Sequence, residues 1–350
     1  MNHSTIDSDY IEMIDAIVVP ENIPDEEKCR RYQPLLDYLN TNTPGSLFRF
    51  RSCKERTIKE FDQDILGFSP ASEMNDDFDS LLYFDKERIK TEMIDAITPQ
   101  HINSILDQFS NSGILVQVEP YIPESFIRNR INELKSIKPD ELYSFIDQFM
   151  TFATEDYDQR ATVISRLTQI LKIACLSRNI ESTAMWGYYA NNGTGFALSY
   201  DLREIDFGEY CLAPVIYGED RFDATEFATW LIQQQLLTRL LIKSNSVAFR
   251  PLLQHIIPCP DQFMPTKIMI HKSSSWSHES EWRLILYEKA GQEKRYPYIT
   301  KKPTAIYLGR NISKTNEKIL CYIAAEKGIP TYKMTIQEGN STYKLVPQKL

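Results

Sequence analysis

Hydrophobic and polar positions follow different periods along this chain. Over residues 1–45, apolar side chains recur at the three- and four-residue spacing of helices, and Pro20 and Pro24 interrupt the pattern. Helical spacing also dominates residues 84–171 and Thr225–Leu253. We therefore expect a helical N-terminal segment in two pieces, a large helical insertion and one long later helix.

Shorter apolar stretches have the length and the period of strands. Because strands and helices do not alternate strictly, the pattern favours an α+β fold with a mixed or antiparallel central sheet. We predict a helical segment at 1–45 and a single α+β domain at 46–350, with the insertion at about 84–171. The predicted strands are 46–52, Ile65–Phe68, Lys172–Leu176, Gly195–Tyr200, Lys267–Ile270, Glu281–Tyr287, Ala305–Leu308, Thr331–Ile336 and Thr342–Val346, with further helices at Thr57–Phe61 and Ser313–Lys327.

Composition narrows the class of protein. With 350 residues, of which 42% are hydrophobic and 25% charged, the chain can bury a core without disulfides or metals. The six cysteines are widely separated and form no CxxC pair, so we expect reduced, mostly buried thiols and no metal site. A net charge of -9 argues against tight sequence-independent binding of duplex DNA.

The sequence also bears on location. No apolar stretch approaches the ~20 residues that a bilayer-spanning helix needs. Acidic residues precede the first apolar run, which differs from a secretion signal. We therefore expect a cytoplasmic protein with no membrane partner.

Four polar and aromatic motifs are candidates for chemistry. In the first, Phe48 to Ser52, the strand period places Arg49 and Arg51 on one face. A guanidinium binds phosphate or carboxylate through two parallel hydrogen bonds, so these arginines are candidate anion ligands. The alternative is an edge strand with a solvated basic face.

The second motif runs from Gly67 to Asp79 and contains a Ser-Pro turn. Side chains such as those of Asn75, Asp76 and Asp77 bond readily to nearby backbone, so we expect them to shape a loop. A cation site is the alternative, but the ligand spacing and central glycine of a calcium loop are missing.

The third motif places Trp186 and Tyr189 three positions apart, before the glycine-rich turn Asn191 to Gly195. One helical turn would bring both rings to the same face, where they could stack on a planar ring of a ligand. Core packing is the commoner use of such a pair. The glycines fit neither the dinucleotide fingerprint nor the P-loop.

The fourth motif is the segment Lys272 to Leu286. On an extended chain, Glu279, Glu281 and Arg283 share one face, opposite Trp282. Two carboxylates beside a guanidinium can stabilise a developing cation or act as a base. The alternative is a structural ion pair between Glu281 and Arg283.

In this order the motifs resemble the bacterial domain-of-unknown-function family twenty-nine seventy-one. That family shows an aromatic-Arg-Ser strand, a Ser-Pro turn before Asn-Asp, a Met-Trp segment and a Lys…Trp-x-x-Glu-x-Glu-x-Arg strand. The resemblance spans Leu47 to Gly309, and Asp77 stands where the family usually has proline, so a different turn is expected there. The matching residues are Phe50-Arg51-Ser52, Ser69-Pro70, Asn75-Asp76-Asp77-Phe78, Met185-Trp186, Tyr189, Gly195, Lys272, Trp276, Glu279, Glu281 and Arg283.

The order of the motifs is also similar to that of the ADP-ribosyltransferase fold, which implies NAD as cofactor and a toxin or phage-defence role. NAD⁺ offers a diphosphate to arginine, a planar ring to aromatic side chains and a glycosidic bond whose cleavage builds positive charge beside a carboxylate. The resemblance implies that NAD is bound by Arg49, Arg51, Ser52, Trp186, Tyr189 and Arg283, and that Glu279 and Glu281 are catalytic.

Two other functions stay open. A nucleic-acid-binding or nucleic-acid-processing protein would use Arg49 and Arg51 for a phosphate and Trp186 for a base, whereas a non-enzymatic interaction module would use the motifs only for its fold. The partners we expect are a small-molecule nucleotide and a nucleic acid or protein as acceptor. The enzyme hypotheses require Arg51, Tyr189 and Glu281 around one pocket.

Overall fold

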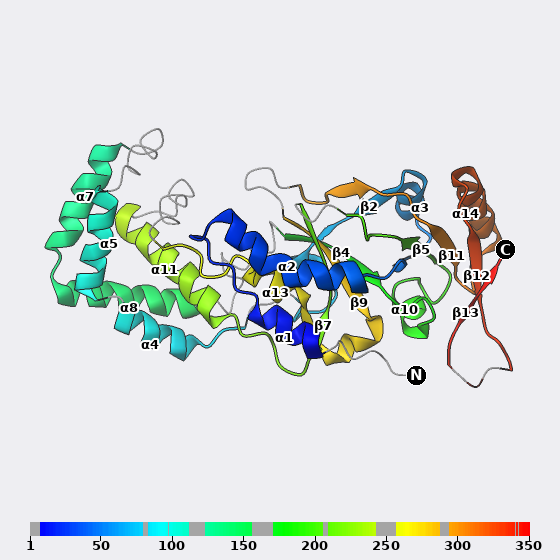
Figure 1. Cartoon of the computed structure of the whole chain (residues 1–350), viewed down its shortest axis with the longest axis horizontal. Helices are drawn as coiled ribbons and strands as arrows, with labels where there is room; N and C mark the ends of the chain where they lie inside the picture. The colour runs from blue at the N-terminus through cyan, green and yellow to red at the C-terminus, as the bar shows by residue number, and fades with distance from the viewer. Residues whose placement is uncertain are drawn as a thin grey trace.

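The computed structural model of this chain is elongated, with helices at one end and a sheet in the middle (Figure 1). No helix in the described part of the chain is both long and apolar enough to cross a membrane. The structure describes residues 8–79, 83–96, 98–111, 123–155, 171–205, 209–242, 257–287, 294–339, 341 and 343–350.

A large mixed sheet forms the centre of the molecule, so the predicted α+β class is confirmed. Neighbouring strands run antiparallel, except that β11 and β12 are parallel. β3 (Ser69–Pro70) pairs with β4 outside the main order. That order is β13 (Val346–Lys349), β12 (Thr331–Thr335), β11 (Ala305–Leu308), β5 (Phe196–Tyr200), β1 (Leu47–Arg51), β4 (Leu171–Ser177), β9 (Glu281–Tyr287) and β6 (Tyr210–Pro214).

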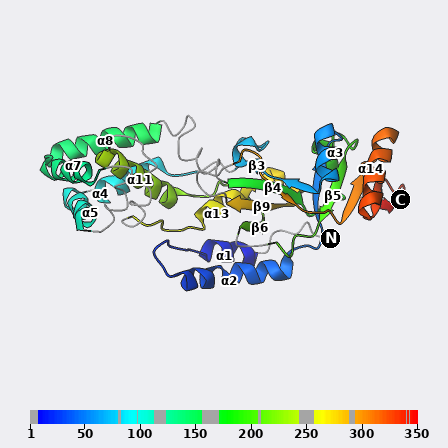
Figure 2. The ribbon, with the colours of Figure 1, turned by 90° about the horizontal axis from the view of Figure 1, so that it is seen from above.

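The helices α1 (Ser8–Ala16) and α2 (Asp25–Asn42) lie along one side of the sheet (Figure 2). Their apolar side chains join the main core, and the Tyr10 hydroxyl donates to the carbonyl of Pro214 in β6. Smaller elements complete this part of the molecule. They are α3 (Glu55–Asp62), η1 (Ala71–Glu73), α10 (Thr183–Tyr188), α13 (Met264–Ile270), η4 (Ser274–Glu279), α14 (Lys314–Lys327) and two two-stranded sheets, β2 (Ile65–Gly67) with β10 (Tyr298–Thr300) and β7 (Ile216–Gly218) with β8 (His271–Ser273).

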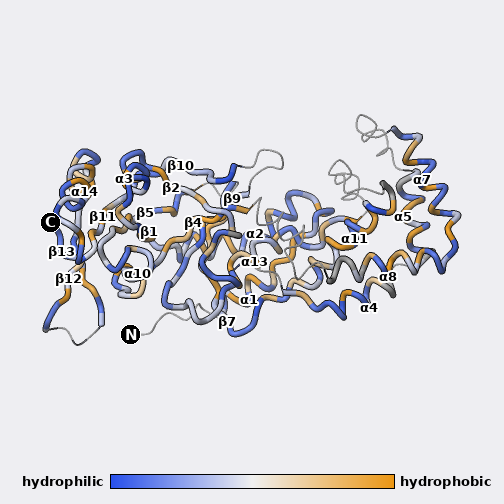
Figure 3. Tube along the Cα trace, turned by 180° about the vertical axis from the view of Figure 1, so that it is seen from behind, coloured by the Kyte–Doolittle hydropathy of each residue, from blue (hydrophilic) through white to orange (hydrophobic). Residues whose placement is uncertain are grey.

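The helical end has its own apolar core (Figure 3). Its helices are α4 (Lys86–Ala96), α5 (Pro99–Asn111), α7 (Glu124–Ser136), α8 (Pro139–Glu155) and α11 (Thr225–Ile242). The last of these comes from outside the predicted insertion, and Ile232 and Leu236 of α11 are buried in the same cluster as Ile127 of α7. The spacing of apolar residues predicts that α11 has an apolar face, but it does not predict against which core this face packs. The predicted division into domains stays a prediction.

Some predicted elements and burial classes are wrong. Residues Lys267–Ile270 belong to the helix α13, where Pro265 sits in the first turn, a position that proline favours. The last strand begins at Val346 instead of ending there, while Thr342, like residues 243–253 of the predicted long helix, lies outside the described residues. The six cysteines are free thiols as predicted, but only Cys259 is buried.

Candidate functional site

The central sheet opens between β1 and β4. β1 pairs with β5 along all five of its residues, but with β4 only at Phe48 and Ser177. A cavity of about 290 Å³ is lined by residues of both strands at this opening. Its lining includes the predicted residues Arg49, Arg51, Tyr189, Glu279 and Glu281, together with Asn75, Cys175, Ser177 and Lys272.

Strand pairing places the arginines and the carboxylates on opposite faces of the sheet. Phe48 shares a face with Ser177, and Ser177 with Glu281, because paired residues of antiparallel strands point the same way. Arg49 and Arg51 therefore point to the other face. They border the same cavity as Glu281 because the cavity lies where the two strands part.

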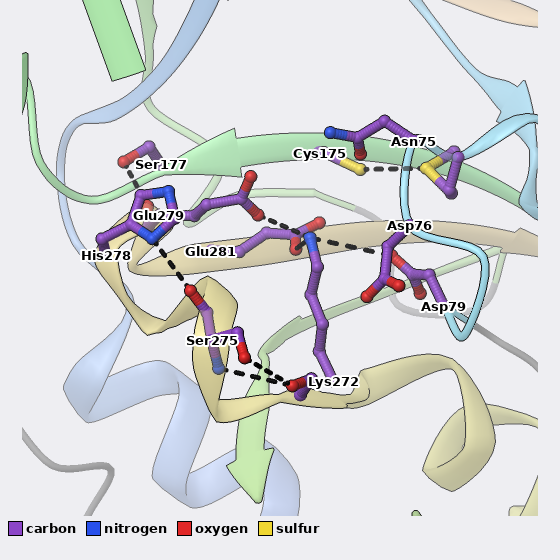
Figure 4. A network of polar contacts seen from close by, with 12 residues as sticks. Asn75, Asp76, Asp79, Cys175, Ser177, Lys272, Ser275, His278, Glu279 and Glu281 are labelled. Carbon is purple, nitrogen blue, oxygen red and sulfur yellow. Dashed lines mark hydrogen bonds and ion pairs between the residues drawn. The ribbon is translucent and has the colours of Figure 1, made fainter. Parts of the chain in front are cut away.

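Lys272 joins the two predicted carboxylates (Figure 4). Its Nζ donates to Glu279 Oε2 at 2.5 Å and to Glu281 Oε2 at 3.1 Å, and lies 3.7 Å from Asp79 Oδ2. The ammonium also lies 4.9 Å from the ring centre of Trp276. All four charged side chains are buried, so their attraction acts with little screening by water.

Arg283 is the second buried cation and is 0% exposed. Its Nη1 and Nη2 donate to the two carboxylate oxygens of Asp79 at 2.8 and 2.6 Å. Its Nε and Nη2 donate to Glu281 at 2.9 and 3.1 Å, so the ion pair considered from the sequence is present. With Lys272 and Glu279, the cluster holds three carboxylates and two cations, an excess of one negative charge.

The charges within this cluster set its protonation states. Burial alone would raise the pKa of Glu281, but Arg283 and Lys272 outweigh burial and lower it to about 2. Burial would lower the pKa of Lys272, yet the charges of Glu281 and Glu279 raise it. The pKa of Arg283 is likewise raised, since Glu281 and Asp79 outweigh burial. Glu281 and both cations therefore stay ionised at neutral pH.

Glu279 reaches the cluster from a turn, not from the strand. The prediction of one extended segment is wrong here, because Glu279 ends the helical turn η4 and Ser280 has a positive φ of 46°. The Ser273 side chain accepts a hydrogen bond from the backbone of Ser275 and so starts this turn. The Ser177 hydroxyl donates to the carbonyl of Glu279 at 2.6 Å and fixes the end of the turn.

Tyr189 connects the carboxylates to the loop of the second motif. Its hydroxyl donates to Glu279 Oε1 and accepts a hydrogen bond from Asn75 Nδ2 at 2.8 Å. Burial raises the pKa of Tyr189, and the hydrogen bond to Glu279 raises it further. The phenol therefore stays protonated and acts as a hydrogen-bond donor to Glu279.

Trp186 lies in the apolar core behind the cavity and is not among its lining residues. It is 2% exposed, its Nε1 donates to the carbonyl of Ile180 at 2.7 Å, and its ring meets Phe50 edge to face at 5.1 Å between centres. Phe50 does line the cavity. Trp186 therefore supports the cavity wall, and of the predicted pair only Tyr189 faces the cavity.

Arg49 and Arg51 of β1 also line the cavity. Arg51 Nη2 lies 3.8 Å from Glu60 Oε2 in α3. Arg49 is only 9% exposed, and its Nη1 has no hydrogen-bond partner within the described residues. Burial lowers the pKa of both side chains, and the charge of Arg49 helps to lower that of Arg51 to about 9. The alternative of a solvated edge strand is wrong, because β1 lies between β5 and β4.

A second cavity, of about 470 Å³, also has Tyr189 in its lining. It lies at the C-terminal end of β1 and at the first turn of α14, where Ser313 caps the helix. The predicted residue Ser52 lines this second cavity instead of the first. The remaining lining residues are Cys53, Lys54, Tyr188, Asn191, Thr194, Asn311 and Asn316.

The acidic residues of the second motif have separate roles. Asp76 Oδ1 accepts a hydrogen bond from the backbone of Phe78 at 3.0 Å, which is the expected loop-shaping role. Asp79 instead turns inward to Arg283. Within the described ranges, no group of three or more His, Cys, Asp and Glu side chains fits a metal ion.

Sequence reasoning did not assign roles to Asp79 and Lys272. Both residues stood inside the predicted motifs, Asp79 at the end of the second and Lys272 at the start of the fourth. Asp79 and Arg283 are 204 positions apart, so no periodicity relates them. The available signal was chemical. Two carboxylates and one guanidinium can be buried together only if further charged groups compensate them, so additional charged partners were to be expected nearby.

Over residues 185–284 the chain is similar to the family described as "Protein of unknown function (DUF2971)". No curated protein and no solved structure matches the chain. The matched region holds Tyr189, Lys272, Glu279, Glu281 and Arg283, but neither Asp79 nor the two arginines of β1.

Proposed function

We propose that the cavity between β1 and β4 binds an NAD-type dinucleotide and that the protein transfers or hydrolyses its ADP-ribosyl group. The observation that carries this proposal is one cavity whose lining includes the cationic residues Arg49 and Arg51 as well as the carboxylate residue Glu279. A dinucleotide has the matching pair of features, a diphosphate and a glycosidic bond that becomes positively charged as it breaks.

Glu279 is the better candidate of the two carboxylates. Glu281 accepts hydrogen bonds from both Arg283 and Lys272, so its charge is already compensated. Glu279 has one cation, Lys272, and one neutral donor, Tyr189. The negative charge in excess within the cluster can therefore act on an oxocarbenium-like sugar through Glu279.

The ligand test compares NAD⁺ with ATP and single-stranded RNA by thermal shift, and measures nicotinamide release with and without a bacterial extract as acceptor. We expect NAD⁺ to raise the melting temperature most and nicotinamide to be released. Glu73→Gln is a matched control for Glu279→Gln. Glu73 also lines the cavity, but it accepts hydrogen bonds from Arg295 and Tyr296 instead of Lys272. Stabilisation by RNA alone would favour the nucleic-acid hypothesis, and no response to any ligand would favour a non-enzymatic module.

A further inference from the structure

The two arginines of β1 that line the cavity have little negative charge beside them. Arg49 and Arg51 lie close enough that the charge of Arg49 lowers the pKa of Arg51. Glu60, at 3.8 Å from Arg51, is the carboxylate paired with them within the described residues. Glu60 is also paired with the exposed Arg56, at 3.4 Å, so three guanidinium groups share one carboxylate and leave positive charge in excess.

Arg49 carries this excess. It is nine-tenths buried, and its Nη1 lacks a hydrogen-bond partner among the residues that the structure describes. A buried ion without a partner is costly, because the lost hydration is not replaced. Arg51, by contrast, retains Glu60 as a partner.

The contrast with Arg283 shows what a compensated buried arginine looks like in this protein. Arg283 donates four hydrogen bonds to two carboxylates. Arg49 lines the cavity, whereas Arg283 does not. Arg49, whose Nη1 lacks a hydrogen-bond partner within the described residues, therefore borders the space that a ligand can enter.

We infer that Arg49 is the principal anion ligand of the cavity, and that it binds a phosphoryl group of the ligand's diphosphate from the face of the sheet opposite Glu279. This deepens the proposed function, because it assigns the diphosphate to Arg49 and leaves Arg51 tied to Glu60. The ligand then passes through the opening between β1 and β4, with its sugar on the carboxylate side.

The test uses inorganic pyrophosphate and the whole chain in a buffer without phosphate or sulfate. Pyrophosphate should raise the melting temperature of the parent protein, and calorimetric titration should show binding. Arg49→Met should weaken this binding roughly thirtyfold or more, since a buried charge pair is lost. Without pyrophosphate, Arg49→Met should melt at the parent temperature or above, because the uncompensated charge is gone.

Two further variants keep the test decisive. Lys59→Met removes an exposed cation of the adjacent helix α3 that pairs with Glu55 instead of Glu60, and it should leave pyrophosphate affinity unchanged. If Arg49→Met does not fold, pyrophosphate binding is measured with Arg49→Lys instead. We expect weaker binding, because lysine keeps the charge but loses the paired hydrogen-bond donors. Parent-like affinity in Arg49→Lys would then overturn the inference.

Other outcomes are equally clear. Absence of pyrophosphate binding in the parent, or unchanged binding in Arg49→Met, would refute the role of Arg49. Tighter competition by single-stranded RNA than by ADP would overturn the diphosphate assignment. Pyrophosphate binding without NAD⁺ cleavage would refute the proposed function but support the anion site. NAD⁺ cleavage that is unchanged in Arg49→Met would refute the role of Arg49 but support the proposed function.

Discussion

Two groups of charged residues lie beside the opening between β1 and β4, and they differ in how well their charges are compensated. Around Arg283 and Lys272, every cation donates to at least two carboxylates or lies within ion-pair distance of them. Around Arg49 and Arg51, Glu60 is the paired carboxylate within the described residues. The first group stabilises the fold, and we propose that the second binds an anion. Compensation, more than residue type, separates Arg283 from Arg49, to which we assign the anion.

Removing Arg283 or Arg49 should have unequal consequences for stability. Arg283→Met leaves Asp79 and Glu281 buried without their main partner, so we expect the free energy of unfolding to fall by about 3–5 kcal/mol. Arg49→Met should change it little. Urea denaturation of both variants measures the difference, and equal losses would contradict the comparison.

Acid should weaken the same cluster. Glu281 has its pKa lowered from 4.5 to about 2 in the folded protein, so its contribution is present above about pH 4.5 and is lost as pH falls towards 2. The shift corresponds to about 3 kcal/mol. Urea denaturation at a series of pH values should show this loss in the parent and a flatter profile in Glu281→Gln. An equally steep profile in the variant would assign the acid sensitivity to other groups.

A smaller effect is expected at the junction of the two cavities. Tyr189→Phe removes the hydroxyl that donates to Glu279 and accepts from Asn75, which should cost about 1.5 kcal/mol of stability. Tyr188→Phe is the matched control, because Tyr188 is 71% exposed and should change stability by less than about 0.5 kcal/mol. Thermal melts of both variants compare them. Equal melting temperatures would mean that the hydroxyl of Tyr189 is not structurally engaged.

Local patterns predicted most of the elements but not their arrangement. The alternation in Leu47–Arg51 identifies a strand, yet it does not reveal that this strand lies between β5 and β4 and parts from β4. The apolar run Lys267–Ile270 fits a strand and a helix equally well, and only its surroundings decide. Pairing between distant strands is set by the whole sheet, so one period cannot specify it.

The candidate site was predictable in its residue types and less so in its geometry. The alternation of Glu281 and Arg283 correctly places them on one face, as their hydrogen bonds show. Alternation could not place Glu279, because serine-backbone hydrogen bonds form a turn there. The spacing of Trp186 and Tyr189 implied one shared face, but the tryptophan enters the core.

The most direct test of the account compares Glu279→Gln with Glu281→Gln in melting temperature and in nicotinamide release. Glu279→Gln removes the negative charge in excess and leaves Lys272 with Glu281, so it should fold with little loss of stability. Its rate of NAD⁺ cleavage should fall about 10²–10³-fold, because the carboxylate that faces the developing positive charge is gone. Glu281→Gln should mainly lower the melting temperature. A parent protein that releases no nicotinamide, or a Glu279→Gln variant that cleaves NAD⁺ at the parent rate, would contradict the account.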